Sequence, residues 1–212
     1  MTKTIKKVTA FVTRETGTGL ELLLFKHPFA GIQIPAGTVE PKEPSEEAVL
    51  RELREETGLT AVDLQTHLGT EIEELPASRR VIIPPATVYA RPDLSSIDWI
   101  CMRWAVQVNA NRQESGFTQI TFIENDHEPE PNYISMQITG WVPDEYLATG
   151  LQRDFYHLAF TGSSPKNWEI FADNHTFKPF WALLSNLPNI IAPQDQWLSH
   201  LAKKFDIPGI YR

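Results

Sequence analysis

The chain has 212 residues, enough to bury a substantial hydrophobic core in one large domain or in one domain with a small module. It carries 27 acidic and 19 basic residues and a net charge of −8, so it lacks the basic footprint of a general nucleic-acid-binding protein. A phosphate-bearing ligand stays compatible with this charge, because bound cations reverse the local field.

Cysteine usage and hydropathy both favour a cytoplasmic location. The single cysteine, Cys101, excludes an internal disulfide and is compatible with a reducing cytosol. The basic N-terminus is followed by an apolar stretch that is too short and too interrupted for a signal peptide, and no run approaches the length of a membrane span. We therefore expect a cytoplasmic protein without a membrane partner.

The chain begins with a predicted β-hairpin. Residues 5–13 alternate apolar and polar side chains, and residues 20–25 follow a glycine-rich turn, so both segments are predicted to be antiparallel strands. His27 stands at the end of the second strand, where it either contacts a ligand or closes the strand. Phe29 follows it in the turn and is a candidate for stacking on a base.

The next stretch, residues 37–59, predicts one helix with a start and a stop. Ser45 is the predicted N-cap, and Glu46 and Glu47 place negative charge in the first turn, where the helix dipole favours it. Gly58 supplies a left-handed stop. The apolar side chains of this helix form a stripe that anchors it to a core.

Three carboxylates gather beside that apolar stripe. At about 100° per residue, Glu52, Glu55 and Glu56 fall within one third of the helix circumference. Like charges at this spacing destabilise a helix unless something neutralises them, and a divalent cation does so. Oxygen ligands suit Mg²⁺ or Mn²⁺. Arg51 lies on the flank of the cluster and is predicted to pair with Glu43, which holds the preceding loop against the helix.

The spacing of these residues resembles the complete signature of the Nudix hydrolases. It runs Gly37, five residues, Glu43, seven residues, Arg51-Glu52-Leu53, one residue, Glu55-Glu56, one residue, Gly58-Leu59. The alternative is a solvated, charge-rich surface helix, which needs neither Gly37 nor Glu43 at those offsets. The resemblance implies an α+β fold, an α/β/α sandwich with a mixed sheet. It also implies that Gly37, through its main-chain carbonyl, joins the three carboxylates on the metal.

Beyond the helix, the sequence predicts further strands and an insertion. Residues 64–75 and 80–90 each look like one strand. Residues 91–150 contain short strand-like runs at 104–108, 117–123 and 133–138, separated by polar turns at 109–116 and 125–132. This pattern of short strands and turns suggests a small β-barrel-like module. The end of the segment, GWVPDEYL, resembles the last strand of bacterial Src-homology-like barrels. The alternative is a long hairpin extension of the main sheet.

The last part of the chain resembles the end of a Nudix domain. Residues 153–160, 168–171 and 176–184 are aromatic-rich predicted strands, and residues 193–205 have the apolar spacing of a closing helix. We therefore predict a Nudix domain formed by residues 1–90 and 151–212, with an inserted module at 91–150. The module is expected to shape a substrate entrance or to supply the interface of a homodimer.

Several late residues are candidates for contact with the substrate. Phe155 and Trp168 are candidates for base stacking, while Glu169 and Asp173 lie in the late loop where many Nudix proteins place a further acidic group. With His27 and Phe29, Glu169 and Asp173 complete the predicted substrate-binding set. His175 lies in the same loop, where it and Asp173 equally fit a role in capping a turn.

Two functions follow from the resemblance. The first is a Mg²⁺-dependent hydrolase that cleaves the pyrophosphate linkage of a nucleoside diphosphate joined to a nucleotide, sugar or phosphate. Catalytic roles then fall to Glu52, Glu55, Glu56, Glu43 and Arg51. The alternative is a non-catalytic nucleotide-sensing module that acts through a protein partner. Such modules usually lose a signature glutamate, and none is lost here.

Overall fold

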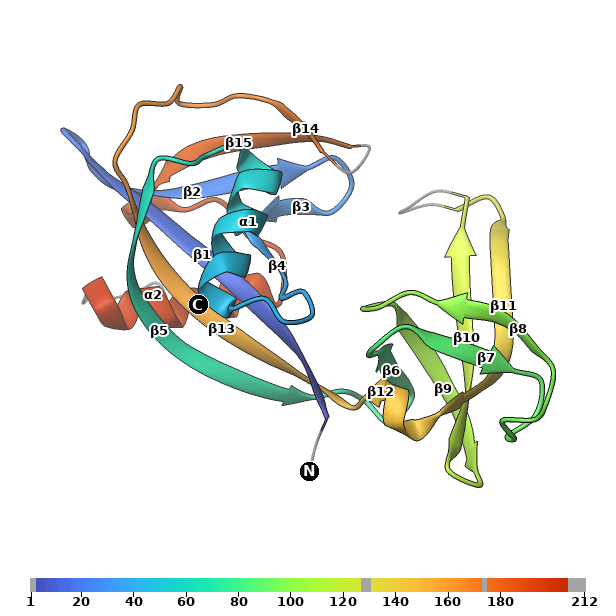
Figure 1. Cartoon of the computed structure of the whole chain (residues 1–212). Helices are drawn as coiled ribbons and strands as arrows, with labels where there is room; N and C mark the ends of the chain where they lie inside the picture. The colour runs from blue at the N-terminus through green and yellow to red at the C-terminus, as the bar shows by residue number, and fades with distance from the viewer. Residues whose placement is uncertain (1–2, 127–130, 173–174, 206–212) are drawn as a thin grey trace. The chain divides into compact units, whose positions relative to one another are not determined.

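The protein consists of two compact units, each built around its own β-sheet (Figure 1). The structure is a computed structural model that describes residues 3–126, 131–172 and 175–205. One unit comprises Met1–Ile5 and Ile72–Gln152, and the other comprises Lys6–Glu71 and Arg153–Arg212. The division between the units therefore falls within three strands, β1 (Thr4–Thr16), β5 (Val62–Glu74) and β13 (Gly150–Phe160).

The eight-stranded sheet has the order β14-β15-β2-β1-β13-β5, with β3 added to β2 and β4 added to β1. The remaining strands of this sheet are β2 (Gly19–His27), β3 (Gly31–Gln33), β4 (Ala36–Thr38), β14 (Ile170–Ala172) and β15 (His175–Leu183). The predicted N-terminal hairpin is confirmed, since β1 and β2 pair antiparallel up to the turn at Thr16 and Gly19.

Two helices cover opposite faces of this sheet. Helix α1 (Ser45–Thr57) packs Val49 and Leu53 into a core with strand residues such as Leu23. Helix α2 (Gln194–Phe205) packs against the other face, where its apolar residues meet Leu24. Successive residues of a strand point to opposite faces, so the neighbours Leu23 and Leu24 join different cores. The predicted α+β sandwich with a mixed sheet is confirmed.

The start of α1 differs by one residue from the prediction. The N-cap is Pro44 in an extended conformation, and Ser45 is the first helical residue without a side-chain capping bond. The Ser45 hydroxyl instead donates to Asp154 Oδ2 at 2.9 Å. Gly58 ends the helix as predicted, with a left-handed φ of 74°.

The unit that contains Ile72–Gln152 has a curled, seven-stranded sheet around a separate core. Its strand order is β12-β6-β9-β10-β11-β7-β8. In chain order the strands are β6 (Arg79–Ile82), β7 (Ala86–Tyr89), β8 (Asp98–Met102), β9 (Gln107–Glu114), β10 (Phe117–Asn125), β11 (Ile134–Pro143) and β12 (Leu147–Ala148). Short 3₁₀ helices follow at Asp144–Tyr146 in this unit and at Leu184–Asn186 in the other.

Three predictions in this region are wrong. Residues 104–108, predicted as a strand, begin in a turn, and only the last two belong to β9. Residues 80–90 form two strands rather than one, because Pro84 and Pro85 cannot donate ladder hydrogen bonds and separate β6 from β7. Residues 109–114, predicted as a polar turn, belong to β9. The side chains of this part of β9 are mostly exposed, so it lacks the apolar alternation by which a strand is recognised.

The seven-stranded sheet begins at β6, before the predicted start of the inserted module at residue 91. Strands β8 to β11 all belong to this sheet. The assignment of residues 91–150 as an inserted module, and its likeness to Src-homology-like barrels, stay predictions. Across the part of the chain that the structure describes, no helix combines the length and the hydropathy needed to cross a membrane.

Candidate active site

Strand β4 and helix α1 meet at Gly37 without room for a side chain. A Cβ atom at Gly37 would lie 1.8 Å from Glu52 Cδ, far inside van der Waals contact. The Glu52 carboxylate accepts a hydrogen bond from the Thr38 amide at 2.9 Å. Burial raises the pKa of Glu52, and the neighbouring Arg51 opposes that shift. Glycine at position 37 therefore allows a half-buried carboxylate to lie directly on the β4 backbone.

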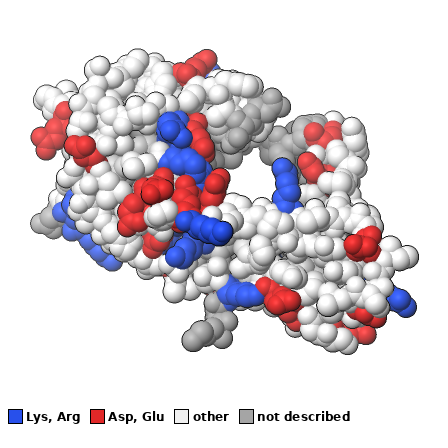
Figure 2. All heavy atoms as spheres, in the orientation of Figure 1, with Lys and Arg blue, Asp and Glu red and all other residues white. Residues whose placement is uncertain are grey.

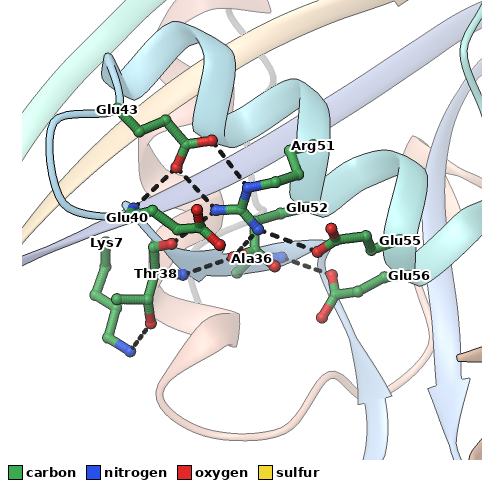
Figure 3. A network of polar contacts seen from close by, with 9 residues as sticks. All are labelled: Lys7, Ala36, Thr38, Glu40, Glu43, Arg51, Glu52, Glu55 and Glu56. Atoms are coloured by element: carbon green, nitrogen blue, oxygen red, sulfur yellow. Dashed lines mark hydrogen bonds and ion pairs between the residues drawn. The ribbon is translucent and has the colours of Figure 1, made fainter. Parts of the chain in front are cut away.

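Arg51 links the carboxylates of this site into one network (Figure 3). Its Nε and Nη2 atoms donate to the two oxygens of Glu43 at 2.8 and 2.9 Å. Its Nη1 atom donates to Glu52 and Glu55, each at 3.0 Å. Nη2 also reaches the Thr38 carbonyl at 2.9 Å. The predicted pair of Arg51 and Glu43 is present, and its two-pronged geometry is the strong form of this interaction.

The loop between β4 and α1 is closed by the same pair. Glu43 Oε2 accepts a second hydrogen bond, from the Glu40 amide at 2.8 Å. The hydrogen bond from Arg51 lowers the pKa of Glu43, and its carboxylate partners raise the pKa of Arg51. Both groups therefore stay charged at neutral pH, and they hold the loop on the helix.

The last two signature glutamates differ in their surroundings. Glu56 Oε2 accepts a hydrogen bond from the Ala36 amide at 2.9 Å, which turns it toward β4. Glu55 is the more accessible, with 47% of its side chain exposed. Figure 2 shows a patch of acidic and basic side chains over α1 and β4. The patch is therefore a charged surface directly on the helix that carries the signature.

The donor set fits a divalent cation, although the side chains do not converge on one point as they stand. Among residues 3–126, 131–172 and 175–205, no three His, Cys, Asp or Glu side chains are arranged to hold a metal ion. Arg51 lies between Glu52 and Glu55, and Glu56 is bonded to an amide. Three carboxylates on one helix and the open backbone at Gly37 still offer the oxygen ligands that Mg²⁺ and Mn²⁺ prefer.

A further cation lies beside β4, and the sequence does not predict it. Lys7 in β1 is paired with Thr38 in β4, and its ammonium donates to the Thr38 hydroxyl. Burial lowers the pKa of Lys7, and the charge of Arg153 lowers it further, while Glu52 opposes the shift. The only sequence signal is a lysine within an alternating strand, which cannot reveal that β4 will pair beside it.

The other predicted substrate residues fall into separate places. His27 and Phe29 lie together at the end of β2, with ring centroids 6.2 Å apart. Glu169 lies in the loop before β14, where its carboxylate pairs with Lys178 at 2.9 Å. Asp173 lies outside the described residues.

The two further stacking candidates lie in different surroundings. Phe155 is fully buried in the core beneath α2 and stacks on His200 at 4.0 Å, so the prediction that it stacks on a base is wrong. Trp168 is half-buried and donates from its indole to the Thr57 carbonyl at 2.7 Å. With Glu169 it lines a cavity of about 350 Å³ at the C-terminal end of α1. The structure therefore leaves only Trp168 of these two beside an open space.

The chain matches one family model and is similar to one curated protein over part of its length. The NUDIX domain family model matches residues 3–116. A Bacillus subtilis (strain 168) protein, YtkD, named as a proposed 8-oxo-dGTP diphosphatase, is 47% identical over 51 residues, which are 24% of this chain and 32% of that protein. The match thus spans about a third of the length of this curated relative.

Among solved structures, two similar chains are both of low sequence identity. A Caenorhabditis elegans Ap4A hydrolase in a binary complex has a TM-score of 0.46 and 11% identity, over 95% of this chain and 98% of that chain. The NUDIX domain of Shewanella oneidensis NrtR, complexed with ADP ribose, has a TM-score of 0.48 and 13% identity, over 97% and 90%. The family model covers more than half of the sequence and includes the whole signature, and the chain therefore belongs to the Nudix family.

Proposed function

We propose that this protein is a Mg²⁺- or Mn²⁺-dependent hydrolase that cleaves the pyrophosphate linkage of a nucleoside diphosphate joined to another group. The observation that carries the proposal is the intact network in which Arg51, Glu52 and Glu55 of α1 join Glu43 of the preceding loop, packed against Gly37. Glu52, Glu55, Glu56 and the Gly37 carbonyl would hold the metal. The metal would supply a water activated near neutral pH and would neutralise charge on the phosphate oxygens.

The residues of the chain have distinct tasks in this proposal. Arg51 and Glu43 hold the loop after β4, so that Gly37 and Thr38 keep their place against α1. The amides of Ala36 and Thr38 orient Glu56 and Glu52.

Glu55 is the proposed general base as well as a proposed metal ligand, each role taking one of its two oxygens, because it is the most accessible of the network carboxylates. It would take a proton from water as the water oxygen bonds to phosphorus and the bridging P–O bond breaks.

The substrate class is a nucleotide in which a pyrophosphate is accessible. The name of the curated relative, which shares 47% identity over the matched 51 residues, favours a nucleoside triphosphate. Dinucleoside polyphosphates, ADP-ribose and nucleotide sugars share the same linkage and belong in the same test panel. The cytoplasmic location and a homodimeric state are part of the proposal.

The first prediction concerns turnover. With Mg²⁺ and the panel, at least one compound should give two phosphate-bearing products, and excess chelator should abolish their release. Glu55→Gln and Glu56→Gln should each lower kcat by several orders of magnitude, because an amide keeps the shape but loses the charge. Chromatography of the products measures both effects.

Glu47→Gln is the matched control, since Glu47 is an exposed glutamate in the first turn of the same helix. It should leave kcat unchanged. Turnover that persists in chelator would refute the metal assignment. Tight nucleotide binding with no product from any compound would favour the nucleotide-sensing alternative.

A further inference from the structure

Four aromatic side chains form a cluster at the end of the eight-stranded sheet. We name His27, Phe29, His175 and Phe177 the ring cluster. The His27 ring centroid lies 5.5 Å from that of His175 and 5.4 Å from that of Phe177, and Phe29 lies 5.7 Å from His175. Phe29 is 53% exposed although it is a large apolar residue. The cluster is therefore a packed aromatic surface with one open ring face.

The ring cluster lies on the face of the sheet that carries α1. Leu23 in β2 and its partner Trp181 in β15 pack into the core with α1. His27 lies four residues beyond Leu23, and Phe177 lies four residues before Trp181. Side chains at even spacing along a strand share one face, so both cluster residues point toward the side of the signature helix.

The chain itself limits how far the ring cluster lies from the carboxylates. Gly31 pairs with His27 across β2 and β3, and only six residues lead from Gly31 to Gly37. An extended chain of that length spans at most about 20 Å. This upper limit and the shared face of the sheet keep the ring cluster near enough to the carboxylates for one ligand to be tested at both places.

His27 adds a directional hydrogen-bond donor to the ring cluster. Its Nδ1 atom accepts hydrogen bonds from the amides of Phe29, at 3.2 Å, and Ala30, at 3.1 Å. Burial, followed by the charge of His175, lowers the pKa of His27, so the ring is neutral at pH 7. A neutral ring that accepts at Nδ1 carries its proton on Nε2. The cluster thus combines apolar ring faces with the Nε2–H group of His27.

We propose that the ring cluster binds the nucleobase of the substrate, with Phe29 stacking on the base and His27 Nε2 donating to an acceptor on its edge. This inference rests on the proposed function, because it assigns the base to one end of a ligand whose phosphates lie at Glu52, Glu55 and Glu56. A nucleobase fits the chemistry, since it has a flat apolar face and hydrogen-bond acceptors at its rim.

Binding without turnover tests the proposal most directly. The four nucleoside monophosphates and ribose 5-phosphate are titrated into the whole protein in excess chelator, and heat of binding is measured. At least one monophosphate should bind at least about tenfold more tightly than base-free ribose 5-phosphate, as expected for one stacked base. Phe29→Leu should remove that difference, and Phe29→Trp should restore it.

Phe171→Leu is the matched control. Phe171 in β14 is 71% exposed, and it pairs with Thr176, so its side chain points to the face opposite His175 and Phe177. This variant should bind the monophosphates as the parent does. The ¹⁵N resonance of His27 Nε2 should move on addition of the tightest monophosphate and stay unmoved with ribose 5-phosphate.

The outcomes separate this inference from the proposed function. Loss of kcat/KM for a nucleotide in Phe29→Leu, with unchanged hydrolysis of a base-free sugar diphosphate, supports the ring cluster as the base site. If the protein hydrolyses none of the compounds but still binds a monophosphate through its base and Phe29, the base site is supported and the hydrolase is refuted. Equal binding of ribose 5-phosphate and every monophosphate, or equal losses in Phe29→Leu and Phe171→Leu, would overturn it.

Discussion

At the scale of single residues, Arg51 organises the site. Its guanidinium donates to Glu43, Glu52 and Glu55 and to the Thr38 carbonyl, and this connects the loop, the strand and the helix. Arginine suits this position because its rigid fork carries several donors in one plane and stays charged. The like charges of the signature glutamates are thereby partly balanced by the protein's own cation.

The spacing of the signature predicts this pair of Arg51 and Glu43, because both residues belong to one short segment. It does not predict Lys7 or the ring cluster. Lys7 reaches Thr38 only through the pairing of β1 with β4, and His27 meets His175 only through the pairing of β2 with β15. Contacts between distant segments depend on strand register, which a single sequence does not encode in a local pattern.

The second prediction concerns the close packing at Gly37. Gly37→Ala should lower kcat by about 100-fold or more, because the new methyl group would displace the Glu52 carboxylate from the Thr38 amide. Gly17→Ala is the matched control, since a Cβ atom at Gly17 would have no neighbour within 4 Å. Steady-state kinetics on any accepted nucleotide measures both. Full activity in Gly37→Ala would contradict the close packing of Glu52 on β4.

At the scale of elements, the N-terminal end of α1 is tied to the sheet by a buried carboxylate. Asp154 in β13 is only 7% exposed. It accepts hydrogen bonds from Ser45 at 2.9 Å and from Thr70 in β5 at 2.6 Å. Burial alone would raise the pKa of Asp154, but the hydrogen bonds from Thr70 and Ser45 leave it lowered. The first residue of the signature helix is therefore bonded to a charged group in the sheet.

The third prediction follows from that tie. Asp154→Ala should lower the free energy of unfolding by about 2–3 kcal/mol, because it removes the acceptor of the half-buried Ser45 hydroxyl and the bond to Thr70 in β5. Asp195→Ala, at an exposed aspartate in the first turn of α2, serves as the control and should cost about 1 kcal/mol or less. Denaturant titration followed by circular dichroism compares the two. Equal shifts of the midpoint would mean that Asp154 does not anchor α1.

Helices and strands are predicted correctly where apolar residues repeat at a regular spacing or where a residue such as glycine marks an end. The signature helix and the closing helix at residues 194–205 are found because their apolar faces repeat at helical spacing and because Gly58 marks an end. Strand β9 is missed because most of its side chains are exposed, and the break between β6 and β7 needs the recognition of Pro84 and Pro85 as a stop. Tertiary pairing, rather than local preference, makes a polar segment such as β9 a strand.

At the scale of the whole molecule, one compact unit takes in Ile72–Gln152, and the inserted module at residues 91–150 stays a prediction. The curled sheet takes in β6 and β7 as well as the strands after residue 91, and the family model at 3–116 covers parts of both units. Composition could indicate that a turn-rich, short-stranded segment exists. It could not place the border, because β1, β5 and β13 each run from one unit into the other.

One buried histidine makes the stability of the unit that contains α1 and α2 depend on pH. His157 in β13 is 5% exposed, its Nε2 atom lies 2.8 Å from the Thr13 hydroxyl, and its ring packs against Phe205 of α2. Its Nδ1 atom has no hydrogen-bond partner among the described residues. Burial, with a smaller effect of Lys204, lowers the pKa of His157 to about 4.

The fourth prediction is therefore a loss of stability in mild acid. A histidine whose pKa is lower in the folded chain binds its proton preferentially in the unfolded chain, so stability is complete above the unfolded pKa of 6.5 and falls as the pH drops toward 4. The full loss is at most about 3 kcal/mol, from the size of the shift. Asp154, whose folded pKa is lowered, loses its contribution only at lower pH, below its usual value of 3.8.

His157→Gln separates this effect from every other titrating group. The variant can keep the hydrogen bond to Thr13 but gains no charge, so its free energy of unfolding should change less between pH 6.5 and pH 4 than that of the parent. Chemical denaturation at half-unit steps of pH gives the two slopes. If the slopes coincide across that interval, His157 does not titrate as a buried neutral base, and the acid sensitivity of the fold must come from its carboxylates.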